Sequence, residues 1–87
     1  MTVNYEGLIG AVTSVKVGSE QISRFTTHSH SELSNRIPYV ANLVRGKNSA
    51  LPAIGAMQIA VESLSNVRTT MKLLEQACDE YLKHLVQ

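Results

Sequence analysis

The chain has 87 residues, of which 44% are hydrophobic and 17% are charged, and its formal net charge is +1. This length allows one domain at most, and the hydrophobic content excludes an intrinsically disordered chain. The basic residues are scattered, with no cluster larger than the pair Arg45 and Lys47, so nucleic acids and anionic membranes are poor candidates as partners.

The first segment, residues 4–25, has a helical pattern. Its apolar residues recur mostly at spacings of three and four, on one side of a helix: Tyr5, Leu8, Val12, Val15, Ile22 and Phe25. The β-branched valines of residues 11–17 would also suit a strand. The spacing is not two, however, and no partner strand follows, so we predict a helix.

Residues 26–31 are six small or polar residues in a row, which favour side-chain to backbone hydrogen bonds over a regular helix. Ser29 and Glu32 have the spacing of a capping box, so a helix is expected to start again there. Pro38 disfavours helical geometry at Ile37. We therefore predict a kinked or broken first helix with segments 4–25 and 30–45; the alternative is one unbroken helix over 4–44.

The turn is predicted at Arg45 and Gly46, because a glycine commonly follows the last turn of a helix. A long helix over residues 50–86 follows. Its apolar residues form a stripe at spacings of three and four: Met57, Ala60, Leu64, Val67, Met71, Leu74, Cys78, Tyr81 and Leu85. Such a stripe must pack against another helix. The predicted fold is therefore all-α, a single antiparallel helical hairpin over residues 1–87.

Two groups of polar residues could suggest chemistry: the histidines His28, His30 and His84, and the acids Glu75, Asp79 and Glu80. An i, i+2 histidine pair does not share a helix face, and the acids have lysines at pairing distance, so both groups fit solvated surfaces. There is no glycine-rich phosphate loop and no nucleophile elbow. We predict a protein that is not an enzyme and has no catalytic residue, metal or cofactor.

The apolar surface is the informative feature. The last helix has a wider apolar sector than the interrupted first half can cover, so a leftover face is expected to bind another helical protein or a second copy. The alternative is a hairpin that closes on itself. The predicted partner interface consists of Met57, Leu64, Val67, Met71, Leu74, Cys78, Tyr81 and Leu85.

This architecture resembles the WxG-type small helical hairpins of the bacterial type VII secretion pathway. The shared features are a length under 100 residues, a start without a cleaved signal, one central turn and two amphipathic helices. Two motifs differ: Arg45-Gly46 stands where the family has Trp-x-Gly, and Leu85 stands four residues after Tyr81 in place of the acid of the export signal. The resemblance therefore implies a secreted substrate or a chaperone or targeting partner of a larger toxin. Members that lack these motifs resemble such partners, which bind a helical protein that supplies the signal.

The last helix also resembles type III secretion needle and inner-rod subunits and the flagellar rod-junction protein, over residues 56–64, 67–68 and 75–81. That resemblance implies a subunit of a helical filament. An immunity-type protein that neutralises a toxin would use the same fold. Because no apolar run approaches the length needed to span a bilayer, no membrane insertion is expected. We expect a cytoplasmic protein that, if secreted, leaves without a cleaved signal peptide.

Overall fold

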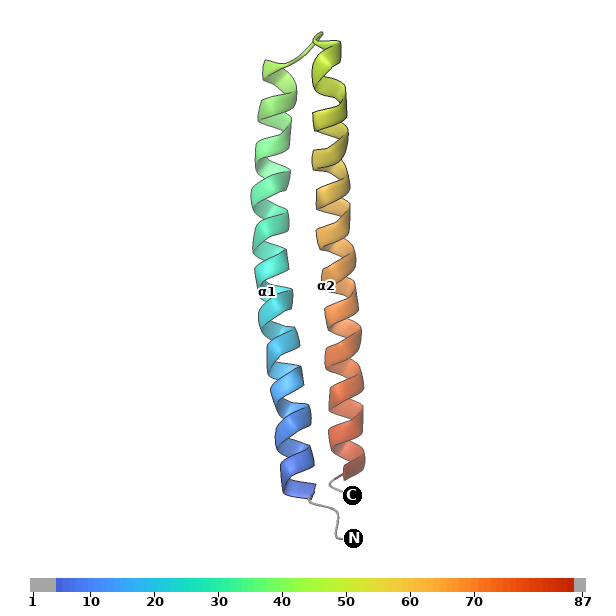
Figure 1. The fold of residues 1–87 in the computed structure, drawn as a ribbon. Helices are drawn as coiled ribbons and strands as arrows, with labels where there is room; N and C mark the ends of the chain where they lie inside the picture. The colour runs from blue at the N-terminus through green and yellow to red at the C-terminus, as the bar shows by residue number, and fades with distance from the viewer. Residues whose placement is uncertain (1–4, 86–87) are drawn as a thin grey trace.

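The structure is a computed structural model that describes residues 5–85. Two long helices, α1 (Tyr5–Leu43) and α2 (Leu51–Leu85), run antiparallel and pack along their length (Figure 1). A short 3-10 helix, η1 (Asn48–Ala50), precedes α2, and the described residues contain no strand. The all-α hairpin is therefore confirmed. The predicted helix ends at residues 4 and 86 lie outside the described residues.

The interruption predicted between residues 25 and 30 is wrong, because α1 is continuous over 39 residues. The hydroxyls that were expected to break the helix are accommodated by it. Thr26 Oγ1 donates to the carbonyl of Ile22 at 2.9 Å, and Thr27 Oγ1 donates to the carbonyl of Ser23 at 2.9 Å. Such back-bonding satisfies a polar side chain without taking the backbone out of the helix. Pro38 also lies inside α1.

The turn is where the sequence predicts it. Gly46 has a φ of +82°, in the left-handed region that glycine adopts without steric cost. The backbone N–H of Lys47 donates to the carbonyl of Val44 at 3.0 Å and closes the turn. Arg45 precedes it, and its guanidinium donates to Oδ1 of Asn42 at 2.8 Å.

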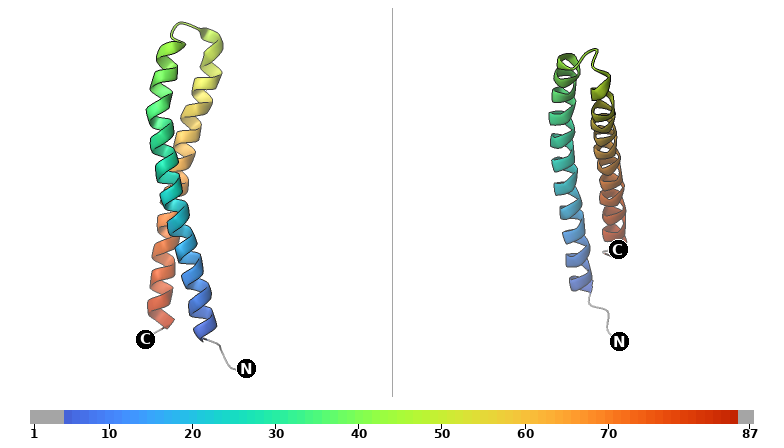
Figure 2. Two further views of the ribbon diagram at one scale, coloured as in Figure 1. Left: turned by 90° about the vertical axis from the view of Figure 1, so that its left-hand side faces the viewer. Right: turned by 45° about the horizontal axis from the view of Figure 1, so that its top comes forward.

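The two helices have a defined register. Lys16 pairs with Asp79, and Ile37 lies beside Gln58, so the numbers of facing residues add up to about 95. In the view turned by 90° the helices cross near the middle of their length (Figure 2). The hairpin is a rod of 68 × 19 × 16 Å. Its radius of gyration of 19.6 Å far exceeds the roughly 12 Å of a compact chain of this length.

Candidate helix-docking surface

The contact between the helices, which we call the seam, follows heptad positions a and d, with Lys16 at position a of α1 and Ile54 at position a of α2. Buried and half-buried residues recur there at spacings of three and four. On α1 they are Val12, Lys16, Ser19, Ser23, Thr26, His30, Leu33, Ile37 and Val40. On α2 they are Ile54, Met57, Val61, Leu64, Arg68, Met71, Glu75, Cys78, Leu82 and Leu85. The seam is apolar near the turn and polar in its middle.

The middle of the seam is formed by small polar side chains of α1. Ser19, Ser23 and Thr26 are its buried residues, at 2%, 4% and 5% exposure. Ser19 Oγ donates to the carbonyl of Lys16 at 2.7 Å, and Thr26 Oγ1 donates within α1 as well. Small residues let two helices approach closely, but they bury little apolar area. On α2, Cys78 is the one apolar side chain that is buried among the described residues.

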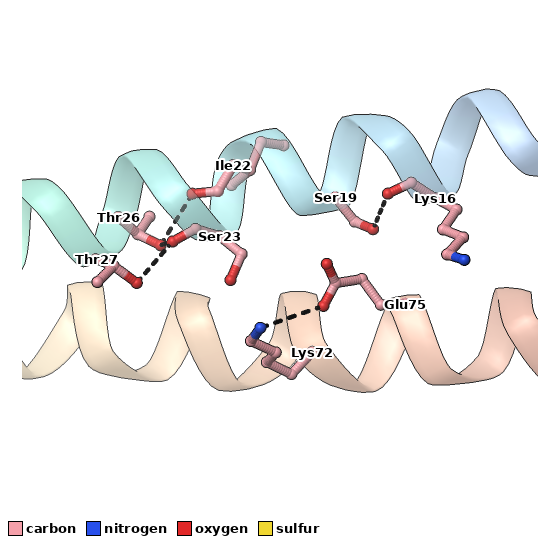
Figure 3. A network of polar contacts seen from close by, with 8 residues as sticks. All are labelled: Lys16, Ser19, Ile22, Ser23, Thr26, Thr27, Lys72 and Glu75. Atoms are coloured by element: carbon pink, nitrogen blue, oxygen red, sulfur yellow. Dashed lines mark hydrogen bonds and ion pairs between the residues drawn. The ribbon is translucent and has the colours of Figure 1, made fainter.

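Charged residues flank this polar stretch. The Lys16 ammonium forms an ion pair with Asp79 across the seam. The hydrogen bond to the Asp79 carboxylate, helped by its charge, raises the pKa of Lys16 above its ordinary value of 10.5. Glu75 points from α2 toward Ser19 and Ser23 of α1 (Figure 3). Its side chain is only 16% exposed and lies 3.8 Å from the Lys72 ammonium. The middle of the seam is therefore held by polar contacts that bury little apolar area.

The two sides of the hairpin differ in chemistry. Heptad positions b and e of both helices lie on one side. Ser34 and Pro38 of α1, together with Gln58 and Glu62 of α2, line one open groove there of about 370 Å³. This side, the polar face, also carries Glu20, Arg24, Lys72, Asp79 and Lys83.

The opposite side, at heptad positions c and g, is the apolar face. On α1 it consists of Leu8, Ala11, Val15, Gly18, Ile22, Phe25, Ser29, Tyr39 and Leu43. On α2 it consists of Ala53, Ala56, Ala60, Ser63, Val67, Thr70, Leu74, Ala77, Tyr81 and the polar, exposed His84. The charged residues there are Glu32 and Arg36, which pair with each other at 2.8 Å.

The exposed large apolar side chains concentrate on this face. Seven of the twelve in the described residues belong to it: Val15, Ile22, Phe25, Tyr39, Leu43, Val67 and Tyr81. Ile59 and Leu73 lie on the outer surface of α2, opposite the seam and between the two faces. The polar face exposes Val17 and Leu51. Since contiguous apolar surface on a rod-shaped protein marks an interaction site, the apolar face is the candidate docking surface.

The structure divides the predicted partner residues into two sets. Met57, Leu64, Met71, Cys78 and Leu85 lie in the seam and are at most half exposed. Val67, Leu74 and Tyr81 lie on the apolar face, where Val67 is 40% and Tyr81 46% exposed. Whether either set binds a partner stays a prediction, but only the second set is placed to do so while the hairpin is closed.

The residues that sequence reasoning missed belong to α1. The sequence placed Val15, Ile22 and Phe25 on one side of the first helix and assigned none of them to the partner interface, yet they are 51%, 47% and 69% exposed. They are spaced 7 and 3 apart, with Gly18 between the first two and Ala11 before them, and form a second stripe beside the seam. The sequence shows this stripe, but nothing in the sequence distinguishes its residues from those of the seam.

The other candidate residues were predicted to lie on solvated surfaces, and for Glu75, whose side chain is only 16% exposed in the seam, that prediction is wrong. His28 and His84 are exposed and His30 is half-buried at the seam. Among the described residues no group of three or more His, Cys, Asp or Glu could hold a metal ion. Neither described helix is long and apolar enough to cross a membrane.

Comparisons of the chain with models of known protein families, with curated proteins and with solved structures found no match. Function is therefore inferred from the residues and their arrangement.

Proposed function

We propose that this chain is a small non-enzymatic subunit that works by helix–helix association with another helical chain. The observation that supports this proposal is the apolar face, which leaves seven large apolar side chains at 40% exposure or more on one side of the rod. The seam buries one apolar side chain among the described residues, so the hairpin has little core of its own. A partner helix laid on the face would supply the missing burial.

We further propose that the association serves a specialised bacterial secretion system of the type VII kind. The support is the likeness to WxG-type hairpins in size, in the two amphipathic helices and in the single central turn. Because Arg45-Gly46 replaces Trp-x-Gly and Leu85 replaces the acid of the export signal, the chain acts as the chaperone or targeting partner of a larger secreted protein. That protein carries the signal.

The test is co-expression of the full chain with the product of its neighbouring gene. Light scattering after size exclusion should give a stable complex that contains both proteins. Tyr81→Asp, on the apolar face, should abolish the complex, and the matched control Val17→Asp, 44% exposed on the polar face, should retain it. Failure of the wild-type proteins to form a complex would contradict the proposal.

A filament subunit of the needle or inner-rod kind is the second candidate. It is favoured by Ile59 and Leu73, which are 64% and 61% exposed at the outer edge of α2. A subunit in a helical filament needs contacts on more than one side, and these residues extend the apolar surface beyond a single face. Electron micrographs of the concentrated protein would show filaments if this candidate holds, and Leu73→Asp would abolish them.

A further inference from the structure

We propose that the groove on the polar face binds an arginine side chain of another protein. The groove is open and has a volume of about 370 Å³. Its lining residues are Ser34, Ile37 and Pro38 of α1 and Gln58, Val61 and Glu62 of α2. It lies on the side of the hairpin opposite the apolar face, so the inference does not depend on the proposed function and adds a second surface to it.

Pro38 leaves one backbone acceptor at the groove without its helical donor. Inside a helix each backbone N–H donates to the carbonyl four residues earlier, and proline has no N–H. The carbonyl of Ser34 therefore lacks the hydrogen bond that any other residue at position 38 would supply. A helical carbonyl points along the axis toward the residue four positions later, and both Ser34 and Pro38 line the groove. This acceptor is thus available to a ligand in the groove.

The polar side chains of the groove also lack partners within the chain. Ser34, Gln58 and Glu62 take part in no side-chain hydrogen bond or ion pair among the residues that the structure describes. The hydroxyls of Thr26 and Thr27, in contrast, bond back to their own helix. Together with the Ser34 carbonyl, these side chains place several oxygen acceptors around one groove.

The charge of the groove selects a cation. Glu62 is the one charged residue at heptad positions b and e of residues 27–41 and 51–69. The next charged residue at these positions of α2, Lys72, lies ten residues further along the helix, about 15 Å away at 1.5 Å per residue. The Glu62 carboxylate therefore has no cation of its own chain within reach of an ion pair, and an anionic ligand would be repelled.

The floor of the groove selects a cation with an apolar stem. Ile37 and Val61 are half-buried there, and the ring of Pro38 lies beside them. An arginine lays its three methylene groups on such a floor and keeps its charged head at the polar rim. Its planar guanidinium has five N–H donors, which can reach a carboxylate and a backbone carbonyl together, whereas the ammonium of lysine is compact and more strongly hydrated.

The experiment uses the full chain labelled with ¹⁵N and N-acetyl-L-argininamide as the probe. Two-dimensional NMR spectra recorded during a titration should show movement of the amide signals of residues 34–37 and 58–62, with a dissociation constant of the order of 1 mM. N-acetyl-L-lysinamide should bind at least about threefold more weakly. N-acetyl-L-norleucinamide, which has an apolar side chain without charge, should leave these signals in place.

Two variants test the acceptors. Glu62→Gln keeps the shape of the side chain and should raise the dissociation constant at least about threefold. The matched control is Glu80→Gln, because Glu80 is exposed on α2, lies outside the groove and has no ion pair among the described residues. Pro38→Ala returns a donor to the Ser34 carbonyl, so it should also raise the dissociation constant at least about threefold while it stabilises the hairpin. A variant that is more stable yet binds more weakly separates loss of the site from loss of the fold.

Four results would overturn the inference. The first is the absence of movement of these signals at a probe concentration of about 100 mM, a hundred times the expected dissociation constant. The second is equal binding of the lysine probe, and the third is equal weakening by Glu62→Gln and Glu80→Gln. The fourth is movement of the same signals with protein concentration alone, which would show that an arginine of a second copy fills the groove.

The proposed function is tested separately by Tyr81→Asp. This change on the apolar face should abolish the complex with the helical partner and leave the binding of the arginine probe unchanged. Loss of probe binding in this folded variant would show that the probe does not bind in the groove, and would overturn the inference.

Discussion

Replacing glycines by alanine should stabilise or destabilise the hairpin according to where each glycine lies. Gly10 and Gly55 lie inside α1 and α2, on the polar face, and a Cβ added at either meets nothing within 4 Å. Alanine is favoured over glycine inside a helix by about 1 kcal/mol. Gly46, by contrast, has a φ of +82°, where alanine costs about 1–2 kcal/mol even though the space around it is open.

The first two sites are far apart, so their effects should add to about 2 kcal/mol. For a chain of this size, 1 kcal/mol corresponds to roughly 4–8 °C in melting temperature. Melts followed by circular dichroism at one protein concentration should show the Gly10→Ala/Gly55→Ala variant about 8–16 °C above wild type. Gly46→Ala should melt below wild type by at least about 4 °C. A melting temperature of the double variant below that of wild type would refute continuous helices through residues 10 and 55. An unchanged melting temperature of Gly46→Ala would refute the left-handed turn.

Three further predictions follow from the helices and the seam. Pro38→Ala restores a backbone donor inside α1, so it should raise the free energy of unfolding by up to about 3 kcal/mol in a urea titration; an unchanged midpoint would argue against a helix there. Because the pKa of Lys16 is raised by Asp79, the ion pair stabilises the fold below pH 10.5 and is lost as the pH rises through that higher pKa. The stability advantage of wild type over Asp79→Asn should therefore shrink above about pH 10.5, and a constant difference would speak against the pair. Cys78, 7% exposed, should react with iodoacetamide only at the rate of unfolding; rapid labelling of the folded protein would show an open seam.

The all-α hairpin and its turn could be predicted from the sequence, because a helical apolar period and a glycine after a helix have direct local causes. The interruption of α1 was predicted wrongly for a similar reason. Polar residues in a row indicate a break when they are judged locally. Here Thr26 and Thr27 bond back to their own helix, and the packing of α2 holds the helix together.

The position of the seam could not be predicted from apolarity alone. On α2 the true seam includes Arg68 and Glu75, and on α1 it includes Lys16, Ser19 and Ser23. If apolar residues alone are assigned to the contact between the helices, these polar positions are left out. The neighbouring stripe of apolar residues is then taken for the seam. For this reason the sequence placed Val67 and Tyr81 on one stripe with Met71. In the structure Met71 lies in the seam, whereas Val67 and Tyr81 lie on the apolar face.

The central claim is that the hairpin alone is incomplete and that another chain covers its apolar face. It is tested most directly by the melting temperature of the full chain as a function of its concentration. If two copies unfold together, the melting temperature should rise by roughly 4 °C for each tenfold increase in concentration. A melting temperature that is independent of concentration, together with no complex between the chain and the product of its neighbouring gene, would show that the hairpin is complete by itself and would contradict the account.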